Sequence, residues 1–154
     1  MLTDQEKIDI DAAAAMYETR SAAAVEALRT VQEARGWVSD EGLADIADYL
    51  DVSPAYLEGL ATFYSMVFRL PVGRHVIMVC NSVCCWMQGS EEVMSYISDK
   101  LGVEPGGTTS EGRFTLLPVV CIGACHHAPA MLVDGALHGD LTPGKIDMIL
   151  AEHK

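Results

Sequence analysis

The stretch "HVIMVCNSVCCWMQG", residues 75–89, decides the fold of the second half of the chain. It opens on "HVIMV", an apolar run rich in residues that favour strands, which predicts a buried β-strand. Three cysteines follow directly, and a helical pattern comes after them, with Val93, Tyr96, Ile97 and Leu101 on one stripe. A strand is therefore expected to end where a cluster of thiols begins, and a helix is expected to return the chain.

Three further patterns follow in this half. "RFTLLPVV" at 113–120 predicts a second strand, and Pro118 favours an edge position for it. "AMLVDGALHG" predicts two short strands joined at Asp134-Gly135, a dipeptide suited to a two-residue hairpin turn. "TPGKIDMILAEHK" predicts a closing helix with Thr142 as its N-cap. The resulting order, β-α-β-β-β-α, is the plan of a thioredoxin-like domain.

The first half of the chain shows the period of short amphipathic helices instead. Its clearest start signal is "TDQE" at Thr3 to Glu6, a capping-box pattern, and its clearest stop signal is Gly36. Helix-like patterns begin at or near Thr3, Ser21, Ser39 or Asp40, and Ser53 with Pro54. We therefore predict an α+β protein of two domains, an N-terminal helical bundle over residues 1–70 and a thioredoxin-like domain over 71–154.

Charge and composition limit the partners and the compartment. Ten basic against 22 acidic residues give a formal net charge of -12, which repels phosphate backbones, so nucleic acid is not expected to bind. The acidic amino terminus lacks the features of a signal peptide, and no apolar run approaches the ~18 residues that cross a bilayer. We expect a cytosolic protein without membrane insertion, in which clustered cysteines indicate metal or redox chemistry.

The strand-helix-strand order brings the cysteines together. A crossover of this kind makes the two strands parallel, so the loops that follow them leave from the same edge of the sheet. One loop holds Cys80, Cys84 and Cys85, and the other holds Cys121 and Cys125. The C-x4-C and C-x3-C spacings are wider than the C-x2-C turns that commonly hold zinc, and they favour a 2Fe-2S cluster with one cysteine pair on each iron.

Four thiolates are enough for such a cluster, so either Cys84 or Cys85 is surplus. Adjacent residues project in different directions, and we expect Trp86 to restrict Cys85, which favours Cys84 as the surplus thiol. Gly123 and Ala124 lie between the second pair and leave backbone N–H groups that can hydrogen-bond to sulfur.

Other chemistries remain open at this point. Four cysteines can hold zinc in an interaction module without redox activity, and a thioredoxin-like order is also typical of thiol-disulfide oxidoreductases. The latter commonly use a C-x-x-C pair, which the sequence lacks. His126 and His127 resemble the histidine pair of a Rieske centre, but four thiolates already complete a cluster, so we expect them to be polar loop residues.

With these motifs placed, the chain resembles the E-subunit family of bacterial NADH:quinone oxidoreductase, the thioredoxin-like 2Fe-2S subunits of respiratory complex I. The similarity runs nearly end to end, through "VQEARGWVS", "PAYLEGLATFYSMVFR", "CNSVCCWMQG", "TTSEGRFTLLPVVCIGACHHAPAML" and "LTPGKID". The family's ligand pattern, carried over to this sequence, implies Cys80, Cys85, Cys121 and Cys125 as cluster ligands and leaves Cys84 outside.

The resemblance also implies a partner. Subunits of this family accept an electron from the FMN of a larger subunit that binds NADH, beside other peripheral-arm subunits on the cytoplasmic side of the inner membrane. The sequence contains no G-x-G-x-x-G pattern after a strand, which agrees with nicotinamide and flavin sites on the partner. Related subunits serve NAD-linked formate dehydrogenases and NAD-reducing hydrogenases, and the cluster ligands do not distinguish these complexes from the respiratory one.

Aromatic residues Tyr56, Phe63, Tyr64 and Phe68 are candidates for contacting the partner, although helix periodicity favours a core position for Tyr64.

Overall fold

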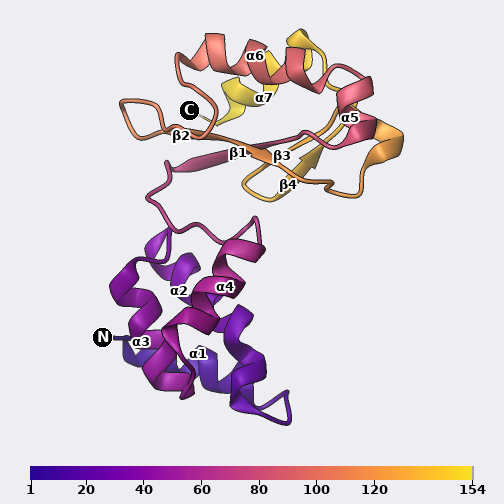
Figure 1. Ribbon diagram of the computed structural model, residues 1–154. Coiled ribbons are helices and arrows are strands. Elements are labelled where there is room, and N and C mark those ends of the chain that lie inside the picture. Colours follow the sequence, from indigo (N-terminus) through magenta and orange to yellow (C-terminus); the bar gives the residue numbers. More distant parts are fainter. Residues whose placement is uncertain (154) are drawn as a thin grey trace. The chain divides into compact units, whose positions relative to one another are not determined.

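The structure, a computed structural model, describes residues 1–153. These residues form two compact units, Met1–Pro71 and Val72 onward (Figure 1). The first unit is helical, and the second combines a four-stranded sheet with helices. The α+β class predicted from the sequence is confirmed.

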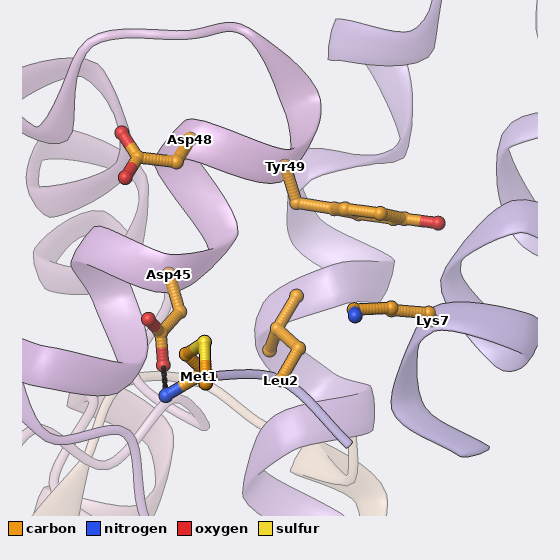
Figure 2. Close-up of a pocket in the computed structure, with 6 residues that line it drawn as sticks. All are labelled: Met1, Leu2, Lys7, Asp45, Asp48 and Tyr49. Carbon is orange, nitrogen blue, oxygen red and sulfur yellow. Dashed lines mark ion pairs between the residues drawn. The ribbon is translucent and has the colours of Figure 1, made fainter. Parts of the chain in front are cut away.

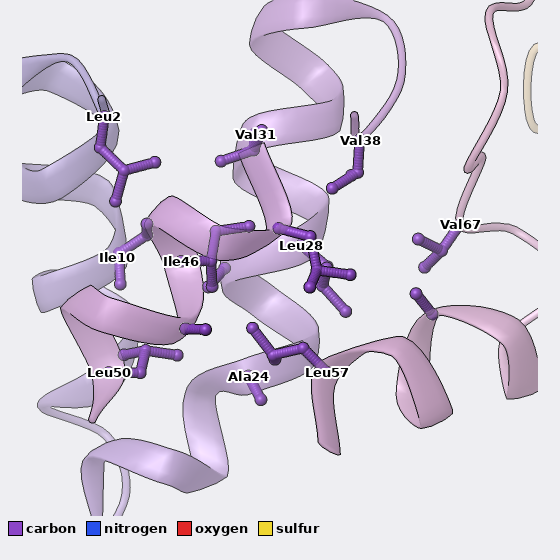
Figure 3. Close-up of a cluster of buried hydrophobic side chains, with 14 residues drawn as sticks. Leu2, Ile10, Ala24, Leu28, Val31, Val38, Ile46, Leu50, Leu57 and Val67 are labelled. Carbon is purple, nitrogen blue, oxygen red and sulfur yellow. The ribbon is translucent and has the colours of Figure 1, made fainter. Parts of the chain in front are cut away.

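The helical unit is built from short helices around one apolar core. Its helices are α1 (Asp4–Ala14), η1 (Arg20–Ala23), α2 (Ala24–Arg35), α3 (Asp40–Leu50) and α4 (Pro54–Phe63). Ile10, Leu28, Ile46 and Leu57, one from each α-helix, are fully buried and meet in the centre (Figure 3). Burial of large aliphatic side chains of this kind contributes roughly 1.5–3 kcal/mol each.

The helix ends follow the signals in the sequence. The Thr3 hydroxyl accepts a hydrogen bond from the Glu6 N–H at 3.2 Å, and the Glu6 carboxylate accepts one from the Thr3 N–H at 2.7 Å, which completes the capping box. Ser39 and Ser53 cap α3 and α4 through their hydroxyls. Gly36 ends α2 with φ of 85°, a left-handed conformation that costs glycine little.

Tyr64 corrects one expectation. It was predicted to lie in the core, but its side chain is exposed. The reason is that α4 ends at Phe63, and Tyr64 has an extended backbone with φ of -85° and ψ of 105°. The 3.6-residue period therefore no longer decides which way this side chain points.

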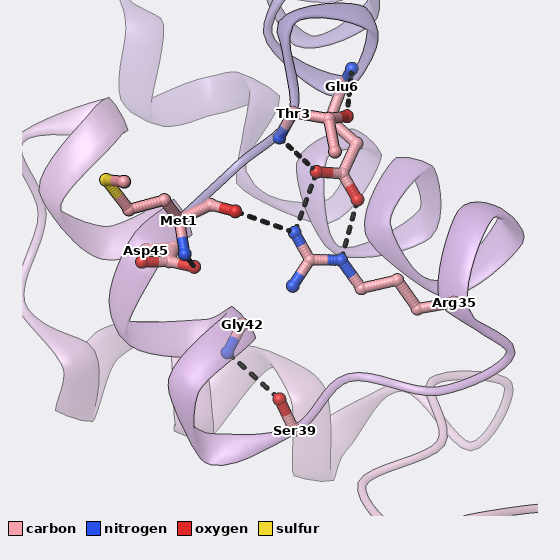
Figure 4. Close-up of polar contacts among 7 residues, drawn as sticks. All are labelled: Met1, Thr3, Glu6, Arg35, Ser39, Gly42 and Asp45. Atoms are coloured by element: carbon pink, nitrogen blue, oxygen red, sulfur yellow. Dashed lines mark hydrogen bonds and ion pairs between the residues drawn. The ribbon is translucent and has the colours of Figure 1, made fainter.

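A partly buried ion pair ties α1 to α2. The Arg35 guanidinium donates to both carboxylate oxygens of Glu6, each at 2.7 Å (Figure 4). The glutamate of the α1 capping box is therefore also the partner of the last residue of α2. Glu6 is only 3% exposed. The hydrogen bonds from Arg35 are the main reason that the pKa of the Glu6 carboxyl falls to about 2. The ionised form of Glu6 is therefore strongly favoured in the folded chain.

We predict that Glu6→Gln lowers the free energy of unfolding of the helical unit by about 2 kcal/mol at neutral pH, because Arg35 loses its partly buried counter-charge. Since the folded-state pKa of Glu6 lies below its ordinary value of 4.5, the wild-type contribution is present above that pH and is lost as pH falls toward 2. Urea unfolding followed by circular dichroism across this pH range measures both effects. The exposed Glu18→Gln is the matched control, and an equal pH dependence of wild type and Glu6→Gln would contradict the prediction.

The second unit is a sheet with the strand order β2-β1-β3-β4. The strands are β1 (His75–Cys80), β2 (Phe114–Val119), β3 (Met131–Val133) and β4 (Ala136–His138), and β2 runs parallel to β1 while β3 and β4 follow as antiparallel strands. The helices are α5 (Val83–Met87), α6 (Ser90–Leu101), η2 (Cys125–His127) and α7 (Pro143–Glu152). α6 and α7 lie on the same face of the sheet (Figure 1), and their apolar residues form one core with Ile77, Val79 and Phe114.

Several local predictions in this unit are confirmed. Pro118 lies on β2, which is an edge strand. Asp134 and Gly135 both have positive φ, 50° and 83°, as a two-residue turn of the hairpin type requires. The Thr142 hydroxyl caps α7.

The sequence did not predict α5, which begins within the first group of cysteines. Across residues 1–153, we find no helix with the length and apolar character needed to cross a membrane.

Candidate metal centre

The parallel pairing of β1 and β2 sets the position of the thiols. In the register of the two strands, Cys80, the last residue of β1, lies opposite Val119, the last residue of β2. The chain after β2 reaches Cys121 two residues later, and the chain after β1 enters α5, which carries Cys84 and Cys85. Both cysteine clusters therefore leave the same edge of the sheet, as the strand-helix-strand order predicted.

The two cysteines that follow β2 hold their sulfurs at a distance typical of two ligands on one metal ion. The Sγ atoms of Cys121 and Cys125 are 3.8 Å apart. Two thiolates on a tetrahedral ion, each about 2.3 Å from it, are themselves about 3.8 Å apart. The N–H of Gly123 donates to the Cys121 sulfur at 3.4 Å, and Gly123 has φ of 80°. One glycine thus shapes the turn and supplies the hydrogen bond to sulfur that the sequence led us to expect.

The first cluster is more sheltered. Cys80 and Cys85 are each 2% exposed. Burial raises the pKa of the Cys85 thiol, and a hydrogen bond with Cys80 and the nearby thiols of Cys80 and Cys121 raise it further. The Cys85 thiol is thus influenced by Cys80 from its own segment and by Cys121 from the segment after β2.

Cys84 also lies at this site. It is exposed, unlike Cys85, and it influences the Cys125 thiol. The pKa of the Cys125 thiol is raised to about 11, mainly by its interaction with Cys121 and next by its interaction with Cys84. Burial distinguishes the two adjacent thiols, because Cys85 is buried and Cys84 is exposed.

The histidines after Cys125 lie outside this set of sulfurs. Both His126 and His127 are exposed, and His127 Nδ1 is 2.8 Å from a carboxylate oxygen of Asp140. That nitrogen is therefore already engaged in a hydrogen bond with Asp140.

A pocket of about 300 Å³ opens in the helical unit, away from the cysteines in sequence (Figure 2). It is lined by Met1, Leu2, Lys7, Asp45, Asp48 and Tyr49. Its groups are an amine, carboxylates and a phenol, so it has none of the thiol chemistry of the second unit.

Five thiols at one end of the sheet, within a thioredoxin-like order of elements, are typical of a protein that binds a metal cluster. A family model described as "Thioredoxin-like [2Fe-2S] ferredoxin" matches residues 10–154. The chain belongs to this family, and its cofactor is one 2Fe-2S cluster.

Relatives with closely similar sequences are subunits of one kind of complex. The chain is 45% identical to the E subunit of NADH-quinone oxidoreductase from Pseudomonas aeruginosa over 150 residues, which cover 97% of this chain and 90% of that protein. It is 47% identical to the E subunit of NADH-quinone oxidoreductase from Escherichia coli K12 over 138 residues, which cover 90% of this chain and 83% of that protein. The resemblance seen in the sequence motifs is confirmed.

A solved structure shares the fold. The air-oxidized form of an NAD+-reducing [NiFe]-hydrogenase matches 81% of this chain with a TM-score of 0.68 and 23% sequence identity, over 22% of the hydrogenase chain. At this identity the likeness concerns the fold.

The donor set fits the cluster. A 2Fe-2S cluster is commonly held by four thiolates, and this end of the sheet offers Cys121 and Cys125 with their sulfurs 3.8 Å apart, together with the buried Cys80 and Cys85. Cys80, Cys85, Cys121 and Cys125 stay our predicted ligands. The position of Cys84 beside Cys125 makes it the one thiol that could replace a member of this set.

Adjacent serine substitutions test the choice. We predict that Cys85→Ser lowers the iron bound per chain several-fold, because a buried ligand is lost, whereas Cys84→Ser leaves iron content and the visible spectrum unchanged. The two variants are matched controls for each other, since they differ by one position in the same helix. Loss of the cluster in Cys84→Ser with retention in Cys85→Ser would identify Cys84 as the ligand instead.

Proposed function

We propose that this chain is the electron-transfer subunit of an NADH:quinone oxidoreductase. In this proposal, Cys80, Cys85, Cys121 and Cys125 hold the 2Fe-2S cluster, which exchanges an electron with the FMN of an NADH-binding partner subunit. The observation that carries the proposal is the meeting of the two cysteine pairs at one sheet edge, with 3.8 Å between Cys121 and Cys125. The 45% and 47% identity to relatives of that name over nearly the whole chain supports it.

The cluster supplies one-electron chemistry, and the protein sets the conditions for it. Burial of Cys80 and Cys85 opposes the extra negative charge of the reduced state, because a charge is less well solvated away from water. The Gly123 N–H directed at the Cys121 sulfur acts in the opposite sense and stabilises that charge. The potential therefore depends on the balance between these two contributions.

The surface around the thiols supports a protein partner. Val83, Trp86, Met87 and Val120 lie next to the cysteines in the sequence, and each is more than half exposed. Exposed apolar side chains gathered around a redox site are typical of surfaces that another protein covers. In the helical unit, Tyr56, Phe63 and Tyr64 are also exposed, which supports a second contact with the same complex.

The proposal extends to location. We propose that the chain lies in the peripheral arm of the complex, on the cytoplasmic side of the inner membrane. Its neighbours there would be the NADH- and FMN-binding subunit and other peripheral-arm subunits, and protein contacts would hold it in place.

The first test is the cofactor itself. We expect the purified chain to be red-brown, to contain iron and acid-labile sulfide in equal amounts, and to give an electron paramagnetic resonance signal on one-electron reduction. Metal and sulfide analysis with spectroscopy checks this in one preparation. A colourless protein that contains zinc would contradict the proposal.

The second test concerns the partner. We predict that Met87→Glu reduces the amount of the NADH- and FMN-binding subunit that copurifies with the chain several-fold, because a charge enters an apolar contact. Met148→Glu is the matched control, since Met87 is 70% and Met148 is 62% exposed but Met148 lies on α7. Iron content should be equal in both variants. Copurification of a formate dehydrogenase or hydrogenase subunit instead would favour the alternative complexes.

A further inference from the structure

A second group of metal-binding side chains lies at the opposite end of β1. His75 is the first residue of β1, Asp134 lies in the turn between β3 and β4, and His153 follows α7. One donor atom from each residue lies within 4.8 Å of the other two. Three elements that are distant in sequence therefore direct nitrogen and oxygen donors to one point.

The backbone of the hairpin turn holds the Asp134 carboxylate in place. Asp134 has φ of 50° at the first position of the turn. Its Oδ1 accepts the backbone N–H of Val76 at 2.8 Å, and its Oδ2 lies 2.6 Å from Nδ1 of His75. One oxygen is thus used for orientation, and the other faces the two imidazole rings.

His153 presents one ring nitrogen, Nε2, to this carboxylate. Its Nδ1 is 2.8 Å from the carbonyl oxygen of Ile149, which can only accept a hydrogen bond, so Nδ1 carries the proton. In the neutral ring, Nε2 is then an acceptor, and it lies 4.0 Å from Asp134 Oδ2. A histidine that donates one ring N–H to a backbone carbonyl and presents the other nitrogen is the usual arrangement of a metal ligand.

The two rings pack together and are only partly open to water. The rings of His75 and His153 meet edge to face, with 5.0 Å between their centroids. The side chains of His75, Asp134 and His153 are 18%, 39% and 22% exposed. The site is sheltered enough to keep its geometry and open enough for water to complete a coordination sphere.

We propose that His75, Asp134 and His153 bind one divalent transition-metal ion, of which Zn²⁺ is the representative. Two imidazoles and a carboxylate suit borderline ions of this kind, with water as a further ligand. Ligand atoms about 2.0–2.2 Å from a tetrahedral ion are about 3.3–3.6 Å apart. The distances of 2.6 Å and 4.0 Å to Asp134 Oδ2 lie on either side of this value, so small side-chain rotations place both donors on the ion.

This site is separate from the thiols. β1 spans six residues from His75 to Cys80, and a strand rises about 3.3 Å per residue, which puts the two ends about 17 Å apart. A bound ion would connect the end of α7 with the hairpin turn and the start of β1. Because the unfolded chain does not hold these donors together, binding would stabilise this unit by linkage.

Zinc titration of the full-length, cluster-loaded chain tests the proposal. After dialysis against a chelator, isothermal titration calorimetry with Zn²⁺ should show a site that is weakened at least tenfold by His153→Gln and by Asp134→Asn. The unfolding temperature of this unit should rise with Zn²⁺ in the wild type and in neither variant. His127→Gln is the matched control, because His127 forms a similar pair with Asp140 at the other end of the sheet, and it should retain the site.

Two results would overturn the proposal. Equal zinc affinity of the wild type, His153→Gln and Asp134→Asn would place any bound ion elsewhere on the chain. If the wild type binds no zinc, or if His127→Gln removes all of its zinc binding, the three residues are a hydrogen-bonded cluster only. The use of two variants keeps the test valid if one of them folds poorly, and iron content checks that the cluster is retained in each.

Discussion

The parallel pairing of β1 with β2 is the constraint on which the metal centre depends. The register that sets Cys80 opposite Val119 brings the chain segments after both strands to one edge. Side chains alternate between the two faces of a sheet, so a shift of one residue in β1 would turn Cys80 toward the opposite face. The core favours this register, because Ile77 and Val79 pack into one apolar cluster with residues of α6 and α7. Packing on one face of β1 thus fixes the position of a sulfur on the other.

The four predicted ligands divide into a sheltered pair and an exposed pair. Cys80 and Cys85 are buried, whereas Cys121 and Cys125 are exposed beside the apolar residue Val120. Such a gradient suits electron transfer, because the sheltered side limits access of water and the exposed side can approach a redox partner. It also explains why the surface near the thiols is apolar in a chain with a net charge of -12. A charged surface there would oppose close contact with a partner through desolvation cost.

Local signals made much of the fold and of the cysteine site predictable, and tertiary packing decided the rest. The turn at Asp134-Gly135 depends on neighbouring residues alone, and the cysteines were found because their spacing is visible along the chain. α5 was missed because "VCCWM" is too short to show a helical period. Which of Cys84 and Cys85 lies deeper depends on how α5 sits against the sheet, which no spacing reveals. His75 and His153 gave no signal, because they meet only when α7 packs on the sheet and brings its end to the start of β1.

The metal-binding groups at the two ends of β1 differ, with thiols at one end and imidazole and carboxylate groups at the other. The two ends therefore differ in the metal ions that they prefer. Thiolates bind zinc as well as iron, so an empty cysteine site would compete with His75, Asp134 and His153 for zinc. Once the cluster occupies the thiolates, the imidazole and carboxylate donors are left to select borderline ions. Assembly of the cluster would therefore come before selective occupation of the histidine site. The distance along the strand keeps each ion with the donors that suit it, while both ends rely on the same buried strand for their geometry.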